Sequence, residues 1–204
     1  MDTAPSTRDL ILDAAEQLFG SQGYAKVTIN QICQAYGLPV GSVYYHFGSK
    51  AGVLSAVLER GTAEIFAGLS AADDQAGPPL ERLAAFYRTA ADLIAKRLPM
   101  YRLLASLQLH QAGSDEVQAI LRESVQRAQA RVVAFIEPVA RSCGVADAAE
   151  CAKDLAALHL VFLTGLVVSA DSAGIDVRTG IGQHLHRLTV ASILDRAAGS
   201  AREH

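Results

Sequence analysis

The chain has 204 residues, with 18 lysines and arginines against 21 aspartates and glutamates, and a formal net charge of −3. This balance excludes a protein that binds nucleic acid indiscriminately through overall positive charge. Half of the residues are hydrophobic but only 6% are aromatic, which favours an all-α protein over a sheet protein. The length allows one or two domains with a sizeable core.

The first seven residues form a short polar stretch without an apolar core, so we expect no signal peptide and a cytoplasmic protein. Cys33, Cys143 and Cys151 have neither metal-ligand spacing nor a disulfide pattern, which suits a reducing compartment. We therefore expect no metal and no cofactor. A redox switch through Cys143 and Cys151 is the alternative to ordinary free cysteines.

The first predicted helix begins at a cap at Ser6 or Thr7 and ends at about Gly20. Its apolar residues recur at helical spacing and form one stripe, made up of Leu10, Ile11, Ala14, Leu18 and Phe19.

Residues 27–50 predict a helix-turn-helix. Thr28 and Gln31 have the spacing of a capping box at a helix start. Apolar residues then follow at helical spacing: Ile29, Ile32, Cys33 and Tyr36. Gly37 suits the left-handed end of that helix, and Pro39 suits the first turn of the next one. Two short helices around a tight turn can place the second helix in a DNA major groove.

The second helix carries small residues and hydrogen-bond donors suited to DNA. Ser42 allows close approach of the backbone, Tyr44 and Tyr45 can lie along the sugar-phosphate wall, and His46 can donate to a phosphate. Lys50 lies in the first turn of the next helix, directly after Ser49, which is a candidate cap. The free backbone amides of that turn and the Lys50 ammonium group together make an anion site.

No aspartate or glutamate occurs from Gln17 to Leu58. The alternative to DNA contact is that residues 44–47 are core aromatics. We expect Phe47 to lie in the core, and one of the two tyrosines could join it.

From about Arg8 to Leu58 the chain resembles the TetR family of bacterial transcriptional repressors. The resemblance is carried by the stretch ILDAAEQLFGSQGYAKVTINQICQAYGLPVGSVYYHFGSKAGVL. It implies an all-helical homodimer with an N-terminal DNA-binding domain and a C-terminal domain for a small molecule. By position, the DNA contacts it implies are Thr28, Ser42, Tyr44, Tyr45, His46 and Lys50.

The chain departs from the family pattern at the start of the recognition helix. Pro39 and Val40 stand where many members have serine and lysine, so a cap and a polar donor are missing. Val40 is instead expected to contact a thymine methyl group.

The predicted domains are a three-helix DNA-binding domain, residues 1–50, and an effector-binding and dimerisation domain, residues 51–204, with about nine helices in all. A long helix starts at Ser49 and breaks within residues 71–79, and the next helix starts near Pro79. Pro99 begins a helix that reaches His110. A further helix runs from about residue 115 toward Cys143, and we expect Pro138 to kink or break it.

The last two helices are predicted to form the dimer interface. Residues 155–170 carry no formal charge, are short for a membrane span, and need burial on several sides. A second apolar stripe follows, made up of Ile181, Leu185, Leu188 and Ile193. Paired with a twofold mate, these helices would form a four-helix bundle. The alternative is one buried core helix in a monomer.

The effector pocket is predicted from an apolar set with a few polar groups, as is usual for small-molecule cavities. The candidates are Phe86, Tyr87, Met100, Tyr101, Leu104, Gln108, Phe135, His159 and Phe162. Each is also compatible with plain core, and His159 is expected to be a buried histidine with its hydrogen bonds satisfied.

The sequence thus predicts a ligand-responsive regulator, most simply a repressor, which a largely apolar effector releases from DNA. A twofold dimer calls for a palindromic double-stranded operator with half-sites roughly 34–36 Å apart. An activator is the alternative within this class. Two alternatives belong to other classes of protein: a helical enzyme, for which we find no catalytic spacing in the sequence, and a helical protein-binding scaffold.

Overall fold

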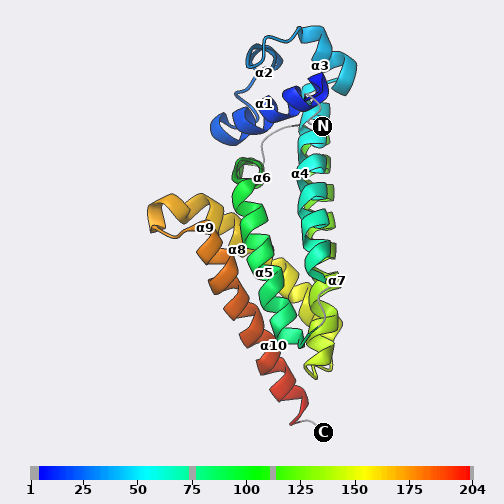
Figure 1. Cartoon of the computed structure of the whole chain (residues 1–204), viewed down its shortest axis with the longest axis vertical. Helices are drawn as coiled ribbons and strands as arrows, with labels where there is room; N and C mark the ends of the chain where they lie inside the picture. Colours follow the sequence, from blue (N-terminus) through cyan, green and yellow to red (C-terminus); the bar gives the residue numbers. More distant parts are fainter. Residues whose placement is uncertain (1–4, 74–76, 111–113, 203–204) are drawn as a thin grey trace. The chain divides into compact units, whose positions relative to one another are not determined.

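The computed structural model describes residues 5–73, 77–110 and 114–202, over which the chain is helical and contains no strand (Figure 1). The helices are α1 (Thr7–Gln22), α2 (Ile29–Gln34), α3 (Val40–Phe47), α4 (Lys50–Asp73), α5 (Pro79–Lys96), α6 (Leu98–His110), α7 (Asp115–Ser142), α8 (Ala148–Ala173), α9 (Val177–Thr179), the π-helix η1 (Gly180–Leu185) and α10 (His186–Ser200). Because α9, η1 and α10 follow one another without a break, the described residues contain the nine helical segments expected from the sequence.

The chain forms two compact units, residues 1–63 with 97–124 and residues 64–96 with 125–204. The predicted boundary at residue 50 coincides with the start of α4. The units, however, divide the long helices α4 and α7 and group α6 with the helix-turn-helix. This grouping has a packing reason, because α6 makes extensive contact with α1.

In the first unit, α1 starts with a capping box. The Ser6 hydroxyl accepts a hydrogen bond from the Asp9 amide at 3.2 Å, and the Asp9 carboxylate accepts one from the Ser6 amide at 3.3 Å. The core around α1 consists of fully buried side chains, namely Ile11, Leu12, Phe19, Ile32, Val43, Leu54 and Leu58.

The helix-turn-helix follows the predicted caps closely. The capping box of Thr28 and Gln31 is present, and Gly37 has the left-handed φ of 64° in the turn. Pro39 lies one position before α3 and provides no side-chain cap, as expected from the sequence. Ser49 caps α4 through a 3.0 Å bond from the Gly52 amide to its hydroxyl.

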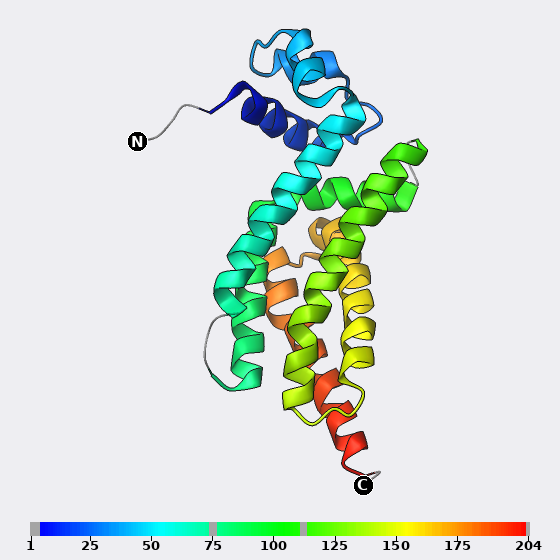
Figure 2. The ribbon, with the colours of Figure 1, turned by 90° about the vertical axis from the view of Figure 1, so that its right-hand side faces the viewer.

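The second unit is built around α5 and α8, which both contact α9, η1 and α10 (Figure 2). One stripe of α5 is buried throughout: Leu83, Phe86, Tyr87, Ala90 and Ile94. Gly180 at the start of η1 lies against the Leu166 side chain, so closely that a Cβ at this position would be 2.6 Å from Leu166 Cδ2.

Two local expectations need correction. Pro138 does not break α7, which continues as one helix to Ser142, because a proline removes a single amide donor and the rest of the helix supports the turn. Tyr36 follows α2 in the turn and is 49% exposed, because α2 ends at Gln34 and the helical stripe ends with it. Leu188 on α10 is 46% exposed in the single chain, and its place at a dimer interface stays a prediction.

The uncharged stretch 155–170 is part of a longer helix than expected. Among the described residues, Ala148–Ala170 is long and apolar enough to cross a bilayer by length and composition, so the argument from a short span fails. Helices of soluble proteins also meet that test, and α8 contacts α9, η1 and α10.

Candidate nucleic-acid interface

The recognition helix α3 is anchored by one buried side chain, Val43, which is fully inaccessible. The residues that follow it face solvent: Tyr44 is 55% and Tyr45 is 85% exposed, and His46 is exposed as well. Neighbouring exposed aromatic side chains of this kind are a feature of interaction sites. The alternative in which both tyrosines belong to the core is therefore wrong.

Phe47 marks the edge of this surface. It is only partly buried, and the guanidinium of Arg8 on α1 lies 5.5 Å from its ring centroid. The prediction of a core position for Phe47 is thus only half correct, because its second face carries a cation rather than core side chains.

Lys50 stands at the start of α4, as predicted, but its ammonium already has partners. Nζ lies 3.5 Å from the Ala25 carbonyl and 4.2 Å from the centroid of the Tyr24 ring. Burial lowers the pKa of Lys50. The side chain is therefore held against the loop before α2 rather than extended freely into solvent.

Thr28 is engaged within the protein. Its hydroxyl accepts from the Gln31 amide at 3.3 Å and donates to Gln31 Oε1 at 2.9 Å. Ser42 is partly buried, and Val40, at the uncapped start of α3, is 39% exposed. The predicted contact residues thus share one short region, and their contacts with DNA stay predictions.

Tyr36 is the exposed aromatic that the sequence argument missed. It lies in the turn shortly before Pro39 and Val40. The signal available in the sequence was Gly37, because a left-handed glycine one residue later ends the helix before Tyr36.

The predicted effector residues fall into two groups. In the second unit, the Phe86 and Phe135 rings stack with centroids 4.0 Å apart, and Phe86 meets Tyr87 edge to face at 5.6 Å. The Tyr87 hydroxyl is hydrogen-bonded to His159 Nε2 and lies 2.6 Å from Thr189 Oγ1. Met100, Tyr101, Leu104 and Gln108 all lie on α6 in the first unit.

Phe162 contributes to a different feature, an open groove of about 350 Å³ on the surface of α8. The groove is almost entirely apolar and is lined by Val161, Phe162, Gly165, Leu166, Ser169, Ala170 and Ile175. It continues an exposed apolar face, because Leu158, Val161 and Val168 on the same helix are 40%, 69% and 54% exposed.

No group of three or more histidine, cysteine, aspartate or glutamate side chains suited to a metal ion occurs among the described residues. All three cysteines are free; Cys33 and Cys151 are buried, and Cys143 is partly buried. Burial raises the pKa of each thiol.

Residues 11–57 match the family described as bacterial regulatory proteins, tetR family. The chain is 28% identical over 154 residues to the HTH-type transcriptional regulator BetI of Brucella canis, which covers 73% of this chain and 77% of that protein. It is 46% identical over 55 residues to the HTH-type transcriptional regulator SrpR of Pseudomonas putida, covering 27% and 26% of the two chains.

Solved structures share the fold over most of the chain. A TetR transcriptional regulator from Legionella pneumophila has a TM-score of 0.73 at 20% identity, over 94% of this chain and 99% of that one. The fatty acid degradation regulator FadR from Bacillus halodurans has a TM-score of 0.74 at 17% identity, over 89% and 97%. These relatives and structural neighbours are regulators of transcription and not enzymes. Residues 11–57 thus match the tetR family of bacterial regulatory proteins, and over most of its length the chain is similar to HTH-type transcriptional regulators and shares the fold of TetR regulators.

Proposed function

We propose that this regulator is a homodimeric repressor that binds an approximately palindromic operator and leaves it when a small, largely apolar effector binds. The observation that supports DNA reading most directly is α3, whose Tyr44, Tyr45 and His46 are exposed around the single buried anchor Val43. A regulator of this kind acts in the cytoplasm, where the DNA is.

Dimerisation is supported by the apolar side chains that α8 and α10 leave exposed. Besides the face of α8 just described, Leu188 and Leu194 on α10 are 46% and 47% exposed. An extended apolar face of this kind is typical of an interface rather than of a monomer surface. A twofold pairing of α8 and α10 would cover it and present two copies of α3 to half-sites roughly 34–36 Å apart.

The effector response rests on a population shift. An effector that binds better to the arrangement unable to fit the operator moves the dimer toward that arrangement, in proportion to its affinity difference between the two. The predicted pocket residues give two separate sets of candidates for its contacts, one in each unit, with α4 as the link to the recognition helix. The set in the second unit is Phe86, Tyr87, Phe135, His159 and Phe162, and the set in the first is Met100, Tyr101, Leu104 and Gln108. An effector with equal affinity for free and operator-bound protein would contradict this mechanism.

Selection of bound duplexes from a random pool tests the DNA-binding part. The wild type should enrich one approximately twofold-symmetric sequence, and Tyr45→Ala should lose most of that enrichment without loss of thermal stability, because the side chain is 85% exposed. Leu109→Ala, which removes a large side chain on α6 that is 59% exposed, is the control and should enrich the wild-type sequence. Equal retention of all sequences by the wild type would reject the proposal.

A further inference from the structure

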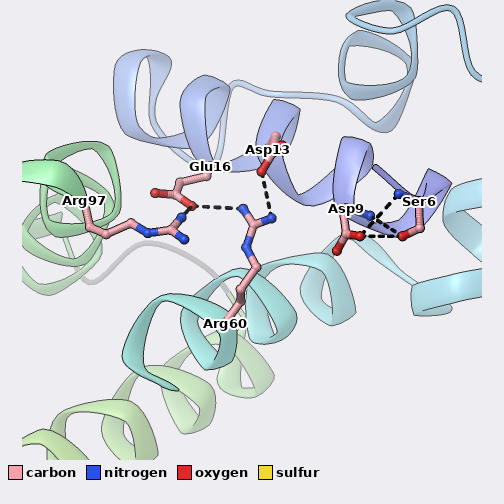
Figure 3. A network of polar contacts seen from close by, with 6 residues as sticks. All are labelled: Ser6, Asp9, Asp13, Glu16, Arg60 and Arg97. Atoms are coloured by element: carbon pink, nitrogen blue, oxygen red, sulfur yellow. Dashed lines mark hydrogen bonds and ion pairs between the residues drawn. The ribbon is translucent and has the colours of Figure 1, made fainter. Parts of the chain in front are cut away.

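A buried carboxylate ties three helices of the first unit together (Figure 3). Glu16 lies on α1, and its side chain is 5% exposed. Its Oε2 accepts from Arg97 Nη1 at 2.6 Å and from Arg60 Nη2 at 3.1 Å. Arg60 belongs to α4, and Arg97 directly precedes α6, where its carbonyl accepts the helical bond from the Tyr101 amide.

Asp13, one turn earlier on α1, binds Arg60 alone. Its Oδ1 lies 2.7 Å from Arg60 Nη1, and its side chain is 49% exposed. Together the two carboxylates balance the two guanidinium groups. Arg60 binds the two carboxylates through different nitrogens, Asp13 through Nη1 and Glu16 through Nη2, so loss of Asp13 leaves its contact with Glu16 in place.

The start of α6 also meets the same two helices at close range. At Gly20 on α1, an added Cβ would lie 2.5 Å from the Pro99 carbonyl oxygen. At Gly61 on α4, an added Cβ would lie 2.0 Å from the sulfur of Met100, which is fully buried. Steric contact limits how near α6 can come, and the shared carboxylate of Glu16 opposes its separation from α1 and α4.

From α1 the connection continues to the recognition helix. α1 contacts both α2 and α3. Arg8 at its first turn lies over the ring of Phe47 at the end of α3, 5.5 Å from the centroid. A displacement of α1 therefore changes the packing beneath α3.

We infer that Glu16 is a positioning residue for DNA binding: by holding Arg60 and Arg97 on one carboxylate, it makes α6 move together with α1 and the recognition helix. The inference rests on the proposed function and goes beyond it, because it assigns the link between the helix-turn-helix and α6 to one charged group. By the reciprocity of linkage, DNA bound at α3 must then stabilise α6, so the link can be measured without knowing the effector.

The experiment measures amide hydrogen exchange of residues 98–110 in the full-length protein, free and saturated with the duplex enriched from the random pool. In the wild type, the duplex should slow exchange of these amides by roughly fivefold or more, the lower end of usual coupling between sites. In the charge-balanced variant E16Q/R97Q the duplex should still slow exchange of residues 40–47, but the effect on residues 98–110 should fall below twofold. The double substitution leaves the pair of Asp13 and Arg60 intact and removes one charge of each sign.

D13N is the matched control. It removes a carboxylate that lies on the same helix and binds the same partner, Arg60, but it leaves Glu16 and Arg97 in contact. It should keep the wild-type protection of residues 98–110. A purely structural role for Glu16 would lower the melting temperature of the double variant without changing the linkage.

Three results overturn the inference. They are a wild-type α6 that the duplex leaves unaffected, a double variant with wild-type linkage, and a D13N protein that loses linkage as fully as E16Q/R97Q. A wild type that prefers no duplex sequence at all would reject the proposed function itself, and this shows in the selection before any exchange is measured.

Discussion

At the scale of single residues, Tyr87, His159 and Thr189 form a buried hydrogen-bonded group in the second unit. His159 Nδ1 donates to the Leu155 carbonyl, so its Nε2 is the acceptor for the Tyr87 hydroxyl, which also lies 2.6 Å from Thr189 Oγ1. The Thr189 hydroxyl lies 2.9 Å from the Leu185 carbonyl. The expectation of a buried, hydrogen-bonded histidine is confirmed. These hydrogen bonds join α5, α8 and α10.

The buried histidine predicts a pH-dependent stability. Burial lowers the pKa of His159 from its usual 6.5. As the pH falls through that usual value, the unfolded chain takes up a proton that the folded chain does not, so the free energy of unfolding decreases until the folded-state pKa is reached. The loss is at most about 1.4 kcal/mol per pH unit for one proton.

Thermal unfolding between pH 7.5 and 5.5 measures this effect. The wild-type melting temperature should fall with pH more steeply than that of His159→Gln, which is less stable at pH 7.5 but lacks this titration. The pKa of His186 is also lowered by burial, and this residue is present in both proteins, so it does not contribute to the difference in slope. Parallel slopes would contradict the assignment.

At the scale of elements, the exposed faces of α8 and α10 are the least explained surface of the single chain. Fully apolar helices are normally buried on several sides, yet Val161 remains 69% exposed. The groove along α8 makes this face uneven, so that a partner of complementary shape can fit it. This favours an interface over chance exposure.

Val161→Glu should therefore weaken dimerisation by at least tenfold, equivalent to about 1.4 kcal/mol, because the new carboxylate would be buried against apolar side chains of the partner. Sedimentation velocity over a concentration series measures the change. Ala130→Glu places the same charge at an exposed position of α7 and should leave the dissociation constant unaltered. A Val161→Glu protein that dimerises like the wild type would exclude this face as the interface.

At the scale of the whole molecule, the charge distribution indicates that DNA binding depends on local contacts and not on overall electrostatic attraction. The chain has a net charge of −3, yet residues 17–58 contain no aspartate or glutamate. Binding must then rely on local donors near α3 and the start of α4, and each phosphate contact contributes to the salt dependence of affinity.

Lys50→Ala tests this point. Loss of one phosphate contact in each of two protomers should reduce the slope of log affinity against log salt by roughly 1.8, at about 0.9 for each contact. Lys50 also contacts Ala25 and Tyr24, so weaker binding by itself would not separate the two roles. A wild-type slope in Lys50→Ala would reject the phosphate role. Lys153→Ala on α8 removes the same charge and should keep the wild-type slope.

Local signals in the sequence determined the all-helical class, the number of helices and the limits of the helix-turn-helix. The reason is that caps, left-handed glycines and prolines act within a few residues of one another, as Thr28, Gly37 and Ser49 do here. The same signals misplaced Tyr36 and Pro138, where the end of one helix and the support of a long one outweigh spacing alone.

Only the tertiary structure decided which surfaces of those helices are covered. Periodicity marks an apolar face but cannot tell a core face from an interface, and only the structure shows that Leu188 and Val161 are exposed on the single chain. Nor does it reveal that Arg60 and Arg97 both bind the carboxylate of Glu16. These arginines follow Glu16 by 44 and 81 positions in the sequence, so they reach it only because the three helices converge. The division of the chain at α4 and α7, with α6 beside α1, has the same origin in long-range packing.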